Sequence, residues 1–100
     1  MDEQGKVTQF LRTLNQQLPI LTERFGVQTL GIFGSYVRQE QRAESDLDVL
    51  VTFMETPGLL KFMALENYLS DLLGVKVDLV MRDALKPNIG QRILQEVVSV

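Results

Sequence analysis

The chain contains 100 residues, of which 45% are hydrophobic and 23% are charged, and its formal net charge is -3. This size and balance predict one globular domain over residues 1–100 and disfavour a largely disordered chain. Cysteine and histidine are both absent, which excludes disulfides, thiol nucleophiles, Ser-His-Asp triads and the usual zinc sites. Any catalysis must therefore use carboxylates, hydroxyls, Lys or Arg, and we expect a hard metal ion to assist them.

The acidic balance also limits the expected partners and location. Direct binding of nucleic acid requires a clustered basic face, which a chain of net charge -3 is not expected to offer. No apolar run reaches the roughly 18 residues of a membrane span, and the acidic N-terminus lacks the pattern of a signal peptide. We therefore expect a cytoplasmic protein that binds neither nucleic acid nor membrane.

The first third of the chain predicts a helix, a strand and a short helical turn. Apolar residues recur at helical spacing over residues 7–18, and Pro19 predicts the end of that helix. Residues 29–33 are apolar and rich in β-forming residues, which predicts a strand ended by Gly34. A short polar helix or turn is then expected over residues 35–39.

Residues 47–53 predict a second strand, whose side chains alternate between two faces. Asp46 and Asp48 share one face of this strand, and the opposite face is entirely apolar. A carboxylate within an apolar strand must be solvated or paired, and a functional site is a common reason to tolerate it.

The remaining chain predicts a long helix and a third strand. Thr56-Pro57 is typical of a helix start, with Thr as the N-cap and Pro at the first helical position, and Gly74 is typical of a helix end. Residues 75–81 then predict the third strand, with Lys76 and Asp78 on one face. The apolar residues of this helix are expected to lie largely inward, and they are Leu59, Leu60, Met63, Leu65, Leu69 and Leu72.

A final helix is predicted from Asn88, which forms a capping-box pattern with Gln91. Val97, Val98 and Val100 lie beyond its apolar stripe, so one apolar edge is expected to remain exposed for a partner or a second copy. The resulting αβαβαβ order predicts an α/β domain with a small mixed sheet covered by helices.

The Gly34-Ser35 pair is the candidate phosphate site. Glycine lets the backbone approach a ligand closely, and the first amides of a helix point toward an anion. We therefore predict that Gly34 and Ser35 bind a β- or γ-phosphate, with the Ser35 hydroxyl as an extra donor. The alternative is an ordinary turn. Arg38 either contacts the triphosphate or is a solvated surface residue.

Three aspartates on neighbouring predicted strands form the candidate metal site. Asp46 and Asp48 lie about 7 Å apart on one strand face, and Asp78 occupies the matching depth on the third strand. Carboxylates, water and phosphate oxygens are the ligands that Mg²⁺ prefers, and two such ions can stabilise the attacking and leaving oxygens of an in-line displacement. Asp78 is expected to bind the metal ion nearest the acceptor and to help deprotonate the attacking hydroxyl.

Residues 34–48 fit the pattern G-S-x-x-R-x-E-x-x-x-x-S-D-x-D. This pattern resembles that of the polymerase-β-type nucleotidyltransferase superfamily. The chain length and residues 77–80 and 85–87 resemble its minimal nucleotidyltransferase (MNT) branch, and the resemblance covers nearly the whole chain. Val37 and Gln39 stand where family members often carry Ala and Gly, a departure that bears on how the nucleotide is placed.

The resemblance implies an activity and a partner. In this family the glycine-serine pair would bind the phosphates of ATP, and the three aspartates would form the metal triad. Members are commonly antitoxins paired with a small helical HEPN toxin, so a hetero-oligomer is expected. The implied reaction is transfer of AMP from ATP to a tyrosine hydroxyl of that toxin, which neutralises it.

Two other functions stay open from the residues alone. The protein could be a non-catalytic antitoxin that acts by binding and occlusion, with the three acids retained but unimportant. It could instead transfer a nucleotide to a small molecule such as an aminoglycoside, although a chain this short has no second domain to form an acceptor pocket. The three acids favour an enzyme that modifies a protein, because a purely binding protein has no physical reason to keep acids within strands.

Overall fold

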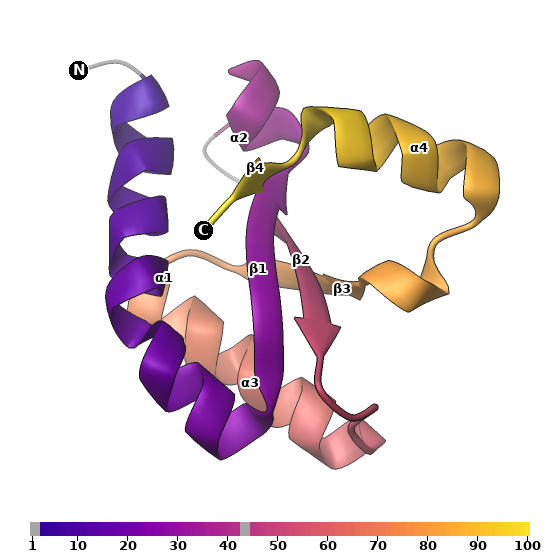
Figure 1. Cartoon of the computed structure of the whole chain (residues 1–100). Helices are drawn as coiled ribbons and strands as arrows, with labels where there is room; N and C mark the ends of the chain where they lie inside the picture. The colour runs from indigo at the N-terminus through magenta and orange to yellow at the C-terminus, as the bar shows by residue number, and fades with distance from the viewer. Residues whose placement is uncertain (1–2, 43–44) are drawn as a thin grey trace.

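The computed structural model describes residues 3–42 and 45–100, which form a four-stranded mixed sheet with helices on both faces (Figure 1). The strand order is β3-β2-β1-β4, in which β2 runs parallel to β3, and β1 is antiparallel to β2 and to β4. This arrangement confirms the predicted α/β domain with a small mixed sheet. In chain order the elements are α1 (Glu3–Phe25), β1 (Val27–Phe33), α2 (Ser35–Arg38), β2 (Leu47–Phe53), α3 (Leu59–Leu73), β3 (Val77–Met81), the 3-10 turn η1 (Arg82–Ala84), α4 (Pro87–Glu96) and β4 (Val98–Ser99).

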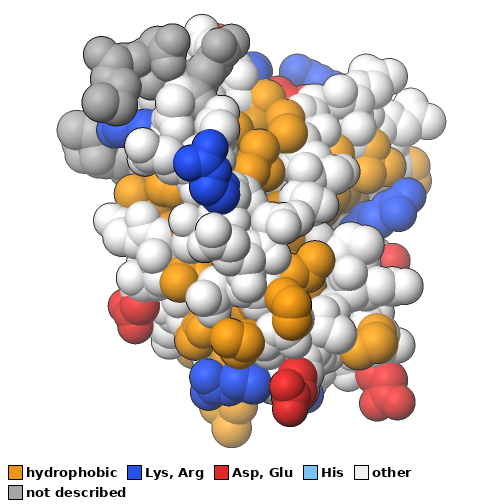
Figure 2. All heavy atoms as spheres, turned by 60° about the vertical axis from the view of Figure 1, so that its left-hand side comes forward, with side chains coloured by type: hydrophobic (Ala, Val, Ile, Leu, Met, Phe, Trp, Pro, Cys, Tyr) orange, Lys and Arg blue, Asp and Glu red, His pale blue; other side chains and the backbone are white. Residues whose placement is uncertain are grey.

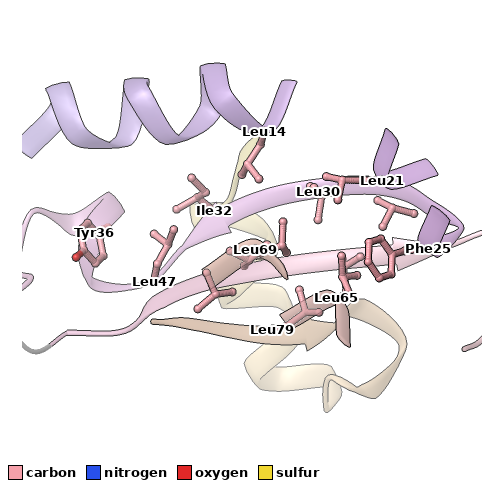
Figure 3. Packing of buried hydrophobic residues seen from close by; sticks show 14 residues of the cluster. Leu14, Leu21, Phe25, Leu30, Ile32, Tyr36, Leu47, Leu65, Leu69 and Leu79 are labelled. Atoms are coloured by element: carbon pink, nitrogen blue, oxygen red, sulfur yellow. The ribbon is translucent and has the colours of Figure 1, made fainter. Parts of the chain in front are cut away.

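The main core lies between one face of the sheet and helices α1 and α3 (Figure 3). Leu14 and Leu21 of α1 and Leu65 and Leu69 of α3 have no exposed surface. Alternate residues of a strand point to opposite faces, so the burial of β2 toward these helices directs Asp48 to the other face. The strand residues that complete this core are Val27, Leu30, Ile32, Leu47, Val49, Val51, Val77 and Leu79.

Helix α1 continues through Pro19, where the sequence predicted its end, and finishes at Phe25. A proline inside a helix removes one backbone hydrogen bond at a cost of about 3 kcal/mol. The two turns that follow bury Leu21 and Phe25, and burial of a large apolar side chain contributes about 1.5–3 kcal/mol. The apolar packing of the last two turns therefore offsets the cost of the proline.

Helix α3 begins at Leu59, after Gly58, so the Thr56-Pro57 pair lies outside the helix that it was expected to begin. Figure 1 shows the first turn of α3 at the lower edge of the molecule, past the end of β2, where no strand covers it. The prediction that this apolar series lies largely inward is therefore wrong for the start of this helix. The exposed residues of the series are Leu59, Leu60 and Met63.

The outer edge of β3 is joined to α3 by side chains. The Val77 amide donates to Ser70 Oγ at 2.9 Å, and the Leu79 amide donates to Glu66 Oε2 at 2.9 Å. These bonds satisfy two backbone donors that β2 does not reach, and they fix α3 against this side of the sheet.

Helix α4 begins at Pro87, one residue before Asn88, so the predicted capping box is wrong. Proline lacks the amide hydrogen that would be unpaired at the first helical position and is favoured there. The Gly90 amide donates to the Lys86 carbonyl at 2.7 Å, which places Lys86 at the N-cap.

The C-terminal residues form a strand that the sequence did not predict. In β4, Val98 lies opposite Ile32 of β1, and the Val100 amide donates to the Leu30 carbonyl at 2.9 Å. Val97 is half-buried and Val100 packs against the core. We expected Val97, Val98 and Val100 to form an exposed apolar edge for a partner. Val97 and Val100 instead pack within the fold, and Val98 stays exposed.

The view in Figure 2 brings the α1 side of the molecule forward. Hydrophobic side chains on this face form small groups separated by polar surface, with charged side chains along the lower edge. Within the described residues, no helix combines the length and apolarity needed to cross a membrane.

Two leucines of α3 give a matched test of this packing. Leu65→Ala should lower the free energy of unfolding by about 2–5 kcal/mol, because it leaves a cavity in the core. Leu60→Ala should change it by no more than about 0.5 kcal/mol, because Leu60 is 83% exposed. Urea unfolding of both variants checks the difference, and equal losses would contradict the described orientation of α3.

Candidate functional site

The candidate site lies where β1 ends and where β2 and β3 begin. Asp48 of β2 is in register with Phe33 of β1 on one side and with Asp78 of β3 on the other. Asp46 immediately precedes β2, and Gly34 immediately follows β1. The structure therefore gathers the glycine turn and the three aspartates at one end of the sheet.

Gly34 packs directly against Asp48. Its φ of 86° lies in a region that L side chains rarely adopt. A Cβ atom at this position would overlap the Asp48 carboxylate, with Oδ2 as the nearest atom. Glycine is therefore required both by the backbone conformation and by the closeness of the aspartate.

Asp48 is the electrostatically perturbed acid of this group. Burial, and then the negative charges of Asp78 and Asp46, raise the pKa of Asp48 to about 6, while the positive charge of Arg38 acts in the opposite direction. A carboxylate with such a pKa is held near like charges without full solvation. Asp48 is therefore close enough to both Asp78 and Asp46 to be affected by their charges.

This donor set fits a hard divalent cation, because added positive charge would relieve the repulsion around Asp48. Within residues 3–42 and 45–100, no three acidic side chains are already arranged to hold one metal ion together. Magnesium usually takes only one or two protein carboxylates and completes its shell with water and substrate phosphate oxygens. The aspartates can therefore supply part of a coordination shell.

The turn after Gly34 is a single helical turn, α2, with four residues. The Val37 and Arg38 amides donate to the Gly34 carbonyl, and the Glu40 amide donates to the Ser35 carbonyl at 2.8 Å. Ser35 is half-buried at its start. A helix this short carries little macrodipole, so anion binding here would depend on individual amides and on the Ser35 hydroxyl.

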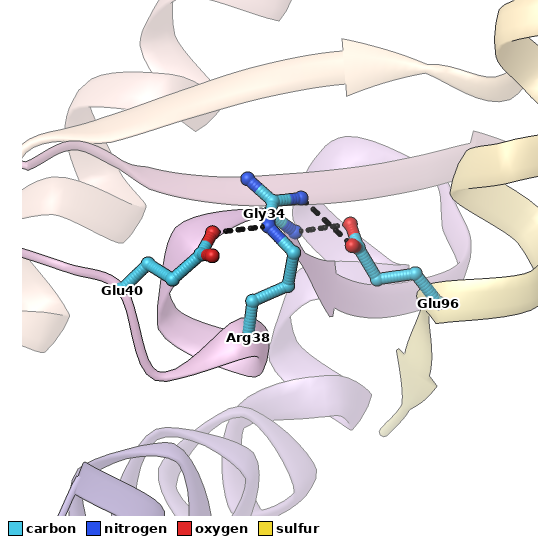
Figure 4. A network of polar contacts seen from close by, with 4 residues as sticks. All are labelled: Gly34, Arg38, Glu40 and Glu96. Carbon is cyan, nitrogen blue, oxygen red and sulfur yellow. Dashed lines mark hydrogen bonds and ion pairs between the residues drawn. The ribbon is translucent and has the colours of Figure 1, made fainter.

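Arg38 connects this turn to the end of α4 (Figure 4). Its Nη1 atom donates to Glu96 Oε1 at 2.7 Å, and its Nε atom donates to Glu40 Oε1 at 2.8 Å. The second oxygen of Glu96, Oε2, accepts a hydrogen bond from the Gly34 amide at 2.7 Å. Glu96 therefore joins the glycine turn to Arg38.

The pKa of Glu96 reflects these bonds. Burial alone would raise it, but the hydrogen bonds from Arg38 and from the Gly34 amide, with the positive charges of Arg38 and Arg92, lower the pKa below its ordinary value. The pKa of Arg38 is raised in turn, first by its hydrogen bond to Glu40 and then by the bond to Glu96.

The sequence did not identify Glu96 as part of the site. It lies 62 residues from Gly34 along the chain, at the end of a helix where an acidic residue is unremarkable in pattern. The pairing of β4 with β1 brings the end of α4 beside the glycine turn. The contact between Glu96 and Gly34 depends on this tertiary pairing and has no signal in the local sequence.

Most of the chain matches a known protein family. Residues 14–100 match the family model described as a nucleotidyltransferase domain. The chain belongs to this nucleotidyltransferase family. That finding confirms the family resemblance drawn from the motif, and it makes the protein a nucleotidyltransferase.

Three individual proteins are similar to this nucleotidyltransferase in sequence or in fold. It is 58% identical over 80 residues to the protein adenylyltransferase MntA of Thermococcus cleftensis, a match that covers 80% of this chain and 81% of the relative. A solved structure described as a putative minimal nucleotidyltransferase is 36% identical, with a TM-score of 0.76, and the match covers 100% of this chain and 97% of that one. The same fold occurs in the complex of a tri-AMPylated Shewanella oneidensis HEPN toxin with an MNT antitoxin, at 21% identity and a TM-score of 0.60, over 97% of this chain and 70% of that one.

The pKa of Asp48 gives a testable pH dependence of stability in the metal-free nucleotidyltransferase. Because the folded-state pKa of about 6 exceeds the ordinary value of 3.8, the folded protein holds this proton more tightly than the unfolded chain does. The contribution of the protonated Asp48 carboxyl to the free energy of unfolding is full below pH 3.8 and is lost as the pH rises through about 6. Thermal unfolding in a chelating buffer should therefore show Asp48→Asn gaining stability relative to the wild type across this window. Asp71→Asn on the exposed surface of α3 is the control, and an identical pH profile for wild type and Asp48→Asn would contradict the assignment.

Gly34→Ala tests the close approach of the glycine turn to Asp48. We expect a loss of at least about 1–3 kcal/mol in the free energy of unfolding, from the positive φ and the overlap with the carboxylate. Gly58→Ala is the matched control, because Gly58 has a φ of -71° and open space around its Cβ position. Chemical denaturation of both variants measures the difference, and a Gly34→Ala protein as stable as Gly58→Ala would show that the turn is wider than described.

Proposed function

We propose that this nucleotidyltransferase is an antitoxin that transfers AMP from ATP to a tyrosine hydroxyl of a cognate HEPN toxin and thereby neutralises it. The observation that carries the proposal is the register of Asp48 with Asp78, next to Asp46 and the Gly34 turn. Support also comes from the similarity to an adenylyltransferase, and from a related fold in complex with an AMPylated HEPN toxin.

Asp46, Asp48 and Asp78 would hold Mg²⁺, as two ions, which when bound would neutralise the charge that develops on the phosphate oxygens. The chain itself would bind and orient the substrate. The amides of the Gly34-Ser35 turn, the Ser35 hydroxyl and Arg38 are the donors suited to the β- and γ-phosphates. This arrangement would fix the α-phosphate near the aspartates, in line with the incoming hydroxyl.

The chemical step is a displacement at the α-phosphorus of ATP. The tyrosine oxygen forms a bond to that phosphorus, the bond to the bridging oxygen of the β-phosphate breaks, and pyrophosphate leaves. The hydroxyl proton passes to the Asp78 carboxylate as general base. Asp78 is exposed, so an acceptor on another protein can reach it from solvent.

The open character of the site suggests why the acceptor would be a protein. Asp46 and Asp48 are only half-buried and Asp78 is exposed, so the described residues leave all three carboxylates partly open to solvent. A toxin surface that docks here would exclude water and complete the site, which a small acceptor cannot do.

Intact mass spectrometry tests the proposal directly. The protein is incubated with Mg²⁺, ATP and the cognate HEPN protein, and the toxin is then weighed. We expect the toxin to gain one or more AMP groups, to lose this gain with the Asp46→Asn, Asp48→Asn double variant, and to retain it with Asp71→Asn. A tight complex without any mass gain would instead indicate neutralisation by occlusion. A gain on an aminoglycoside but not on the toxin would indicate a small-molecule acceptor.

A further inference from the structure

Glu96 occupies the donors that the proposed function assigns to the triphosphate. One carboxylate oxygen accepts the Gly34 amide and the other accepts Arg38 Nη1, both at 2.7 Å. A carboxylate that offers two oxygens to two convergent donors presents the same pattern as two oxygens of a phosphate group. Figure 4 shows the Glu96 side chain extending from the end of α4 to meet both groups.

The two acidic partners of Arg38 are not equivalent. The Glu96 side chain is 21% exposed, whereas that of Glu40 is 64% exposed. The Glu40 carboxylate accepts only the Nε hydrogen of Arg38 in this network, whereas the Gly34 amide donates to Glu96. An exposed ion pair of that kind contributes little, while a charge-assisted bond to a partly buried amide is stronger. Of the two carboxylates, Glu96 is therefore the one that holds the Gly34 amide and Arg38 together.

The backbone that carries Glu96 is fixed, but its side chain has another position to take. Beyond Glu96 the chain is held by the pairing of β4 with β1, and a Cβ atom at Gly31 would overlap the Val97 side chain. Arg92 lies one helical turn before Glu96, and its positive charge already acts on the Glu96 carboxylate. A shallow pocket lined by Arg38, Arg92 and Glu96 gives the carboxylate space to turn toward Arg92.

We propose that Glu96 is a built-in competitor of the nucleotide, whose carboxylate holds the Gly34 amide and Arg38 until a triphosphate displaces it toward Arg92. The inference rests on the proposed function, because it takes the triphosphate as the ligand of these donors. When the donors are free for only a fraction of the time, the apparent Kd for the ligand equals the intrinsic Kd divided by that fraction. Glu96 would therefore set the nucleotide concentration at which the enzyme becomes loaded.

Calorimetric titration of the whole chain with ATP and Mg²⁺ tests this competition. Glu96→Gln keeps the length of the side chain but removes its charge, and we expect the Kd for ATP to fall about tenfold. Glu40→Gln is the matched control: it removes the other carboxylate from Arg38 without freeing the Gly34 amide, and its Kd should stay within about twofold of the wild type. Tripolyphosphate should show the same gain as ATP with Glu96→Gln, whereas adenosine should show none, because the competition concerns the phosphate donors.

An ATP affinity that is unchanged or weaker in a folded Glu96→Gln protein, beside measurable binding by the wild type, would overturn the inference and leave the proposed function standing. Absence of ATP binding by every variant would overturn both. The wild type gives a second test that does not depend on the stability of a variant. In ¹⁵N-labelled protein, tripolyphosphate should shift the resonances of the Gly34 amide and of Arg38 Nη1, the two donors that Glu96 holds, and unshifted resonances under saturating ligand would overturn the competition.

Discussion

The parallel register of β2 and β3 determines where the carboxylates of Asp48 and Asp78 lie. Leu47 and Val49 are held in the core by α1 and α3, so Asp48 between them must point to the other face of the sheet. The pairing of β2 with β3 then sets Asp78 directly beside it. The carboxylate cluster is thus a consequence of how the apolar half of the sheet packs. A slip of one residue between these strands would turn one acid into the core and separate the pair.

The same packing explains why the site is electrostatically unfavourable without a ligand. The fold holds Asp48 between Asp78 and the Gly34 turn, and its pKa is raised first by burial and then by the charges of Asp78 and Asp46. Natural proteins accept such local penalties at functional sites, where a bound cation or substrate relieves them. Glu96 supplies the negative charge that faces the Gly34 amide, and it shares Arg38 with Glu40.

The sequence predicted the parts of the molecule that local patterns determine. The apolar face formed by alternate residues over Leu47–Phe53 predicted β2 with its observed bounds, and Gly74 ends α3 in the left-handed conformation as expected. Tertiary packing decided the rest. Pro19 predicted a helix end that the burial of the following turns overrides, and the edge strand β4 forms because β1 offers it an open edge. Glu96 joins Gly34 only through that pairing, and no local pattern encodes a contact between residues so far apart.

The bonds between α3 and the rim of β3 also restrict how another protein can approach. A strand at the rim of a sheet normally invites a foreign strand to pair with it, which leads to aggregation or to partner binding by strand addition. On β3, the outward amides of Val77 and Leu79 already donate to Ser70 and Glu66. A visiting chain would have to break these bonds before it could extend the sheet there. A partner that reaches Asp78 must therefore present a side chain to the end of the sheet, which is the manner in which a hydroxyl acceptor would have to arrive.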